Sequence, residues 1–382
     1  MCKSLHLVKD NTIASVILLQ VRRISHMRPR CVFALTTLVA LCTVLVETGA
    51  AQGTAPTRAY PPPGKMVDVG GWRLHLNCTG SSKRNGPTVV LEAGAGDFSV
   101  DWGLVQPEVA RFARVCSYDR AGAGWSELGP RPRTWRQIAY ELHTALQKAG
   151  EKGRYVVVGQ SLGGLLIRTF ASQYPKEVAG MVLVDSTHED TVLMMNGKFQ
   201  RMRELSQGRT IPPIRTTISA AEKDLSAEEK EQTADILKRA PKIGSPYNLL
   251  PADLQAARLW VLTQQRHYTA DGDPYWGEEF AELYAARQKE EQQLGDRPLV
   301  VLLTNPGPPG GKPPSGFSAD EWQRVNEEKR QQKVEFTKLS SNSKLIVTEK
   351  SEHHIHLAEP AVVTRAIQMV VDAAQRHTKL AP

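Results

Sequence analysis

The feature that most constrains the fold is a series of short, continuous aliphatic runs separated by helical patterns. The runs lie at 73–76, 88–91, 114–118, 155–158, 181–184, 299–303 and 345–347. Runs of this kind are typical of strands that are buried on both faces. Helical patterns at 136–149, 162–174 and 360–375 follow or separate several of them. The alternation predicts repeated β-α-β units and an α/β domain with a mostly parallel sheet.

One long interval breaks this alternation. Residues 187–296 contain no convincing strand, whereas charge-rich helical patterns recur at 220–238, 251–264 and 278–293. A loop of that length without secondary structure would be exceptional in a compact domain. The interval therefore predicts an inserted helical cap over the carboxyl edge of the sheet, where α/β folds bind their ligands.

These patterns divide the chain into four parts. Residues 52–65 are rich in Ala, Pro and Thr and are predicted to be a flexible linker. The α/β core is expected to comprise 66–186 and 298–382, with the cap at 187–297 between its two halves. A Gly/Pro-rich stretch at 305–316 predicts a second irregular loop on the edge that the cap covers.

The first part of the chain, 1–51, has the pattern of a secretory signal. Residues 31–46 carry no charge, follow two arginines, and precede small residues that include Ala50 and Ala51. This pattern predicts export with cleavage near those alanines, and Met27 is a plausible initiator for such a signal. The run is shorter than the roughly 20 apolar residues of a spanning helix, although a retained N-terminal anchor is the alternative.

Composition excludes two broad classes. With 41% hydrophobic and 23% charged residues, the chain has the balance of a globular protein and not of a disordered one. Lys and Arg exceed Asp and Glu by 48 to 40, and residues 1–51 account for half of the net charge of +8. The small remaining excess does not predict a nucleic-acid partner.

Cysteine usage agrees with export. Cys78 and Cys116 are the only cysteines beyond residue 51. Two cysteines in an exported protein can form a disulfide, and two buried free thiols are the alternative. No histidine pattern accompanies them, so no zinc site is predicted.

The sharpest chemical signal is Gly159-Gln160-Ser161-Leu162-Gly163, which follows an aliphatic run directly and precedes a helical pattern. In a strand-turn-helix context, G-x-S-x-G is a nucleophile elbow, which presents the serine hydroxyl at the top of a sheet. Ser161 is therefore the predicted nucleophile, and an ordinary Gly-rich turn is the alternative.

With this elbow the chain resembles the α/β-hydrolase superfamily over about residues 66–375. The resemblance is supported by the segments 91–96, 118–126, 174–175 and 351–353. It implies a mostly parallel eight-stranded sheet with helices on both faces and an inserted helical cap.

The resemblance also assigns roles to single residues. The backbone N–H groups of Leu162 and Ala95 match the donors of the oxyanion hole, and His353 matches the general base. His354 is the alternative base. A metal site among His353, His354 and His356 lacks a supporting carboxylate or cysteine pattern, and no phosphate-binding or dinucleotide motif is present, so neither a metal nor a cofactor is predicted.

The acid that orients the base is harder to assign. Most relatives place an Asp after the seventh strand, where this chain has no carboxylate before Asp320. Some relatives use the end of the sixth strand, which matches Asp185, and this is the preferred acid. Asp320, a cap residue or a dyad without an acid are the alternatives, and Asp185 could instead serve only to fix its loop.

These assignments predict an exported serine hydrolase that cleaves a carboxylic ester or a related acyl substrate. Ser at the elbow argues against dehalogenase or epoxide hydrolase chemistry, because relatives of those types place Asp there. Peptidase, thioesterase and acyltransferase activities stay open.

The expected partner is a small acyl compound. A membrane is an expected partner only if the leader is retained. A binding protein that has lost catalysis is the alternative, and the sequence makes no prediction of oligomeric state.

Overall fold

The computed structural model describes residues 60–81, 86–151, 153–195, 197–304, 313 and 316–380. The predicted signal and most of the predicted linker lie outside the described residues, as does most of the predicted Gly/Pro-rich loop. None of the helices within these ranges is long and apolar enough to cross a bilayer.

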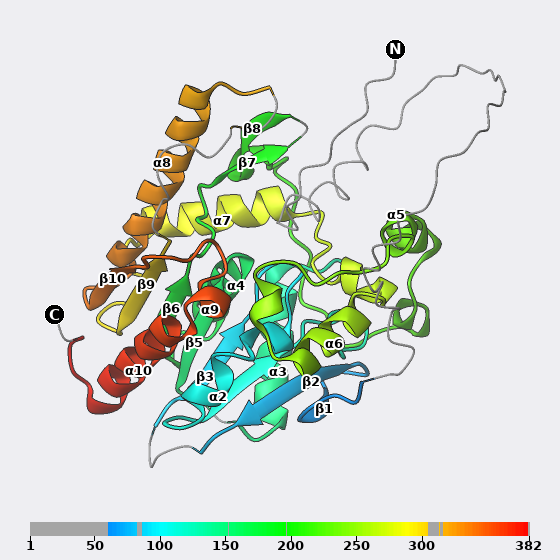
Figure 1. Ribbon diagram of the computed structural model, residues 1–382, viewed down its shortest axis with the longest axis horizontal. Coiled ribbons are helices and arrows are strands. Elements are labelled where there is room, and N and C mark those ends of the chain that lie inside the picture. Colours follow the sequence, from blue (N-terminus) through cyan, green and yellow to red (C-terminus); the bar gives the residue numbers. More distant parts are fainter. Residues whose placement is uncertain are drawn as a thin grey trace, which may run out of the picture.

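The core is a mostly parallel eight-stranded sheet in the order β1-β2-β4-β3-β5-β6-β9-β10 (Figure 1). β1 and β2 are antiparallel to their neighbours, and the other strands are parallel to one another. The strands are β1 (Lys65–Asp68), β2 (Arg73–Thr79), β3 (Thr88–Glu92), β4 (Val115–Tyr118), β5 (Tyr155–Gln160), β6 (Val178–Val184), β9 (Leu299–Leu303) and β10 (Ser343–Val347). The predicted fold class is confirmed, and all seven predicted strands are present.

The helices belong partly to the core and partly to the segment between β6 and β9. Those of the core are α2 (Gln106–Val109), α3 (Trp135–Lys148), α4 (Leu162–Gln173), α8 (Ala319–Glu335), α9 (Ile355–Ala358) and α10 (Pro360–Arg376). Those between β6 and β9 are α5 (Ala227–Leu237), α6 (Ala252–Val261) and α7 (Trp276–Lys289). The three helices predicted at 136–149, 162–174 and 360–375 correspond to α3, α4 and α10.

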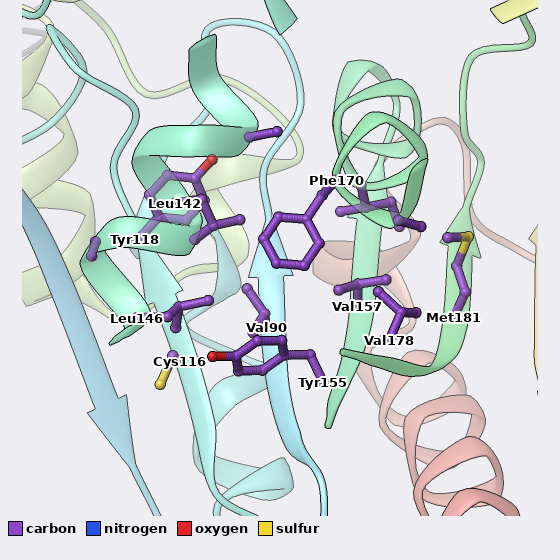
Figure 2. Packing of buried hydrophobic residues seen from close by; sticks show 14 of the residues in the cluster. Val90, Cys116, Tyr118, Leu142, Leu146, Tyr155, Val157, Phe170, Val178 and Met181 are labelled. Carbon is purple, nitrogen blue, oxygen red and sulfur yellow. The ribbon is translucent and has the colours of Figure 1, made fainter. Parts of the chain in front are cut away.

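Alternate residues of each buried strand supply two separate cores. On one face, Val157 of β5 packs with Leu142 of α3 and Phe170 of α4 (Figure 2). On the other face, Val158 packs in the cluster that contains Val370 of α10. Every residue of β5 is buried, which explains why its residues 155–158 are continuously apolar and do not alternate with polar ones.

Two strand predictions need correction. The segment 187–297 contains a hairpin, β7 (Val192–Met195) and β8 (Lys198–Arg201), where no strand was expected. The sequence at 196–197 reads Asn-Gly, which is a strong hairpin signal because both residue types tolerate the left-handed backbone of a tight turn. β1 begins at Lys65, inside the predicted linker, and it is a short edge strand with only one buried residue, so its apolar signal is weak.

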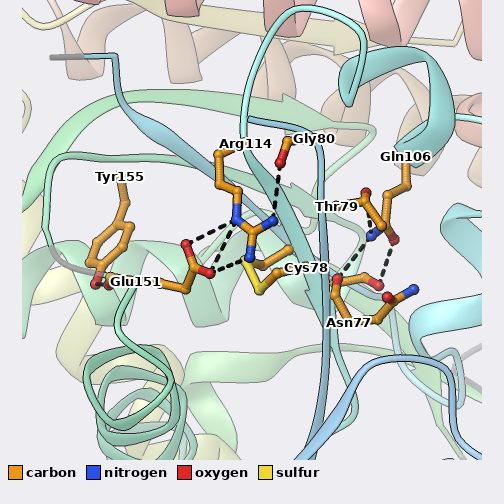
Figure 3. The surroundings of a disulfide bond; sticks show 10 residues. Asn77, Cys78, Thr79, Gly80, Gln106, Arg114, Glu151 and Tyr155 are labelled. Carbon is orange, nitrogen blue, oxygen red and sulfur yellow. Dashed lines mark hydrogen bonds and ion pairs between the residues drawn. A yellow bond between two sulfur atoms is a disulfide. The ribbon is translucent and has the colours of Figure 1, made fainter. Parts of the chain in front are cut away.

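A disulfide joins Cys78 and Cys116. The two residues face each other in the antiparallel pair β2–β4 (Figure 3). Nearby, Arg114 donates a 3.0 Å hydrogen bond to the Gly80 carbonyl and pairs with Glu151. The crosslink therefore reinforces the attachment of the antiparallel edge of the sheet to its parallel part.

Replacing both cysteines, Cys78→Ala with Cys116→Ala, should lower the free energy of unfolding by about 3 kcal/mol. The disulfide closes a loop with a sequence separation of 38, and its loss increases the entropy of the unfolded chain. Urea unfolding of the oxidised parent and of the double variant measures the difference. The reduced parent is the control and should lose a similar amount, whereas equal midpoints in all three samples would contradict the prediction.

Candidate active site

Ser161 lies at a sharp turn between β5 and α4. Its backbone has φ 52° and ψ −121°, a strained conformation for a residue with a side chain. Glycines allow the turn to pack closely: a Cβ added at Gly159 would lie 2.4 Å from the Gly163 carbonyl oxygen, and one at Gly163 would lie 2.5 Å from that of Glu92. The Ser161 side chain is buried, and its Oγ makes no hydrogen bond to the described residues.

The structure brings His353 and Asp185 together. Asp185 follows the last residue of β6, with φ 41°, and His353 lies in the loop between β10 and α9. His353 Nδ1 is 2.6 Å from Asp185 Oδ2. Gln160, the residue before Ser161, donates a 3.2 Å hydrogen bond to the His353 carbonyl, so the histidine loop adjoins the elbow.

A lysine also contacts this carboxylate. Lys333 of α8 donates a 2.7 Å hydrogen bond to Asp185 Oδ1. Burial opposes ionisation of Asp185, but the charge of Lys333 and the hydrogen bond from His353 outweigh it and hold the pKa of Asp185 well below its usual range. Asp185 is therefore ionised and oriented by two partners.

Neither rival residue is bonded to Asp185 within the described residues. Asp320 is exposed in the first turn of α8, and no contact with His353 is found within the described ranges. His354 instead bonds Tyr247, with its Nε2 3.0 Å from the phenol oxygen. The His356 ring packs against Trp102 at 4.7 Å, and burial lowers the pKa of His356 to about 3. The three histidines thus have separate partners and do not converge on one point.

The predicted oxyanion loop lies against the elbow. A Cβ added at Gly94 would be 3.2 Å from Ser161 Cβ. The guanidinium of Arg120 donates to the Ala93 carbonyl at 2.8 Å and to the Gly94 carbonyl at 2.6 Å. Arg120 thus holds the carbonyl groups of this loop. Among the described residues, neither the Ala95 N–H nor the Leu162 N–H has an acceptor, so both are available as the predicted donors.

Three buried ion pairs that sequence reasoning missed connect the segment between β6 and β9 to this loop and its neighbours. Asp271 accepts a 2.8 Å hydrogen bond from the Gly96 N–H and a 2.7 Å one from Arg120 Nε. Arg258 of α6 pairs with Asp97 at 3.1 Å and also binds Asp101. Asp271 lies in a polar stretch whose only local signal is that of a turn, so its partners could not be inferred from its neighbours in sequence.

An apolar cluster surrounds the candidate oxyanion donors. Leu162 packs with Trp135 of α3 and with Phe280 of α7, and Ala95 packs against the same cluster. Met202, which follows β8, completes it from the segment between β6 and β9. The surroundings of the elbow therefore combine apolar side chains on this side with the His353–Asp185 pair.

The chain belongs to the alpha/beta hydrolase fold family, whose model matches residues 87–304, more than half of the chain. The match spans β3, the elbow and the segment between β6 and β9.

Individual relatives are distant. The chain is 24% identical to an AB hydrolase superfamily protein of Gibberella zeae over 75% of this chain and 86% of that protein. It is 23% identical to the uncharacterized protein YqjL of Bacillus subtilis over 81% and 92%. An uncharacterized vacuolar membrane protein of Saccharomyces cerevisiae matches at 31% over 36% of this chain and 23% of that protein. The chain spans less than a third of such longer fungal relatives.

Among solved structures, the epoxide hydrolase CorEH has the same fold, with a TM-score of 0.50 and 17% identity over 79% of this chain and 94% of that one. At that identity the likeness concerns the fold alone.

Gly163→Ala should destabilise the protein by about 2 kcal/mol, because the new methyl group would overlap the Glu92 and Ala93 carbonyl oxygens of the neighbouring loop. In an unconstrained helix the same change would stabilise by about 1 kcal/mol. Gly244→Ala, where an added Cβ meets nothing within 4 Å, is the control and should leave stability nearly unchanged. Thermal unfolding of both variants compares them, and equal melting temperatures would refute close packing at the elbow.

Proposed function

We propose that the protein is a serine hydrolase that cleaves a carboxylic ester or a related acyl substrate through a Ser161-His353-Asp185 triad. The observation that carries the proposal is the 2.6 Å contact between His353 Nδ1 and Asp185 Oδ2, in a loop that is bonded to the residue before Ser161. A nucleophile, a base and an acid have these mutual roles in serine hydrolases. Membership of the α/β-hydrolase family supports hydrolytic chemistry.

In the proposed reaction, His353 Nε2 takes the proton of the Ser161 hydroxyl as Oγ attacks the acyl carbon. The carbonyl π bond opens, and its electron pair moves to the oxygen. Ala95 and Leu162 donate their N–H groups to this oxyanion. The tetrahedral intermediate then collapses, the alcohol leaves with the proton from His353, and the acyl group remains on Oγ.

Water completes the cycle. His353 takes a proton from water as the hydroxide attacks the acyl-enzyme, and Ser161 leaves with that proton while the acid product departs. Asp185 accepts the hydrogen bond from Nδ1, which fixes the tautomer with Nε2 free and stabilises the imidazolium in each step. The low pKa of Asp185 keeps it ionised throughout.

The proposal includes export, since a signal-like segment precedes the described residues and a disulfide is compatible with an oxidising compartment.

Asp185→Asn should lower kcat for p-nitrophenyl esters by about four orders of magnitude, because the amide favours the wrong His353 tautomer. Asp320→Asn is the matched control and should retain parental kcat, since that side chain is exposed on α8. Both variants should keep the parental melting temperature within a few degrees. The reverse result, with loss in Asp320→Asn only, would transfer the role of the acid to Asp320.

Ser161→Ala should abolish ester turnover and also labelling by an alkyl phosphonate, because both require the Oγ nucleophile. Intact-mass measurement after phosphonate treatment should show one adduct on the parent and none on the variant. A folded parent that takes up no adduct and turns over no ester of any acyl length would favour the binding-protein alternative.

A further inference from the structure

The acid of the proposed triad has a second partner that the triad scheme does not require. Lys333 Nζ lies 2.7 Å from Asp185 Oδ1, whereas His353 Nδ1 lies 2.6 Å from Oδ2 of the same carboxylate. The Asp185 side chain is 4% exposed and that of Lys333 is 22% exposed. One buried carboxylate thus binds an ammonium and an imidazole at once, one on each oxygen.

The placement of Lys333 costs α8 stability. Lys329 precedes Lys333 by one turn, so the two like charges lie on one face of the helix and repel each other. Burial and the neighbouring Lys333 lower the pKa of Lys329 to about 8. Within the described ranges Lys329 has no ion pair or hydrogen bond of its own. A helix face that needed only to pack would not gather two cations at a partly buried position.

We propose that Lys333 is a positioning residue of the active site, which fixes the Asp185 carboxylate for His353 and offsets part of its charge. The inference rests on the proposed function, since it assigns Asp185 to the triad. Fixing the carboxylate fixes the His353 ring that it binds, which the proposed proton transfer from Ser161 requires. Offsetting part of the Asp185 charge weakens the attraction between this carboxylate and a positive charge on His353.

The other charged groups near His353 determine what a pH profile will report. On α8, Lys329 adds a second positive charge that is lost above about pH 8. On the histidine's own loop, the His354 ring lies 5.3 Å away, and burial lowers the pKa of His354. Asp97 pairs with Arg258, and its Oδ2 lies 3.7 Å from His354 Nε2, whereas Glu352 is exposed. None of these groups bonds Asp185, so Lys333 is the cation whose removal should act on it most directly.

Three substitutions at Lys333 separate its charge from its hydrogen bond. Lys333→Met removes both and should move the acidic limb of the kcat/KM profile for a p-nitrophenyl ester to higher pH by about one unit, with kcat about tenfold lower. Lys333→Gln keeps a hydrogen-bond donor without the charge. The acidic limb should therefore still move to higher pH, whereas kcat should fall less than in Lys333→Met. Lys333→Arg restores the charge and should return the limb to its parental position. Lys338→Met, at an exposed lysine that pairs with Glu291 and Glu335, is the matched control and should change neither quantity.

A second measurement does not depend on turnover. In the Ser161→Ala background, NMR titration of the His353 ring nitrogens should show protonation at higher pH when Lys333→Met is added. If Lys333→Met moves neither the His353 titration nor the acidic limb, the inference is overturned. It is also overturned if the acidic limb moves as far in Lys333→Arg as in Lys333→Met. Absence of ester turnover with a shifted titration would instead contradict the proposed function alone. If Lys333→Met does not fold, Lys333→Gln and Lys333→Arg give the same comparison.

Discussion

The close packing of the elbow on the neighbouring loop is the constraint on which the rest of the site depends. Gly163 approaches the Glu92 and Ala93 carbonyl oxygens so closely that no side chain fits between them. This contact holds the start of α4, where Leu162 follows Ser161, against the end of β3 and the loop that contains Ala95. The strained backbone of Ser161 is maintained because β5, buried along its whole length, cannot relax.

The sheet explains why distant residues meet. β3, β5, β6 and β10 are parallel, so their carboxyl ends lie on one edge, and the loop with Ala95, Ser161, Asp185 and His353 each follow one of them directly or within a few residues. A parallel α/β sheet collects functional residues at this edge irrespective of their separation along the chain. Contacts of Asp271 and Arg258 attach the segment between β6 and β9 to residues that follow β3 and β4. Such buried pairs add specificity of placement more readily than stability.

Much of this arrangement was predictable. The continuous apolar runs identified seven strands, because strands buried on both faces carry no alternation. The glycines around Ser161 predicted the elbow, because only residues without a side chain fit that turn. The hairpin β7–β8 was predictable from Asn196-Gly197 but was obscured by the helical segments that follow it. β1 was missed because an edge strand with one buried residue has a polar sequence.

The sequence by itself determined the fold class, the position of Ser161 and a short set of candidates for its partners, since each depends on local pattern and on the order of the strands. Only the tertiary structure placed Asp185, and not Asp320, against His353, because that choice depends on which carboxyl-end loop reaches the histidine. It alone placed Lys333 on the same carboxylate, across 148 residues of chain. A charge on a polar helix looks the same in the sequence whether it faces water or a buried acid, and the packing of α8 on the sheet decides between the two.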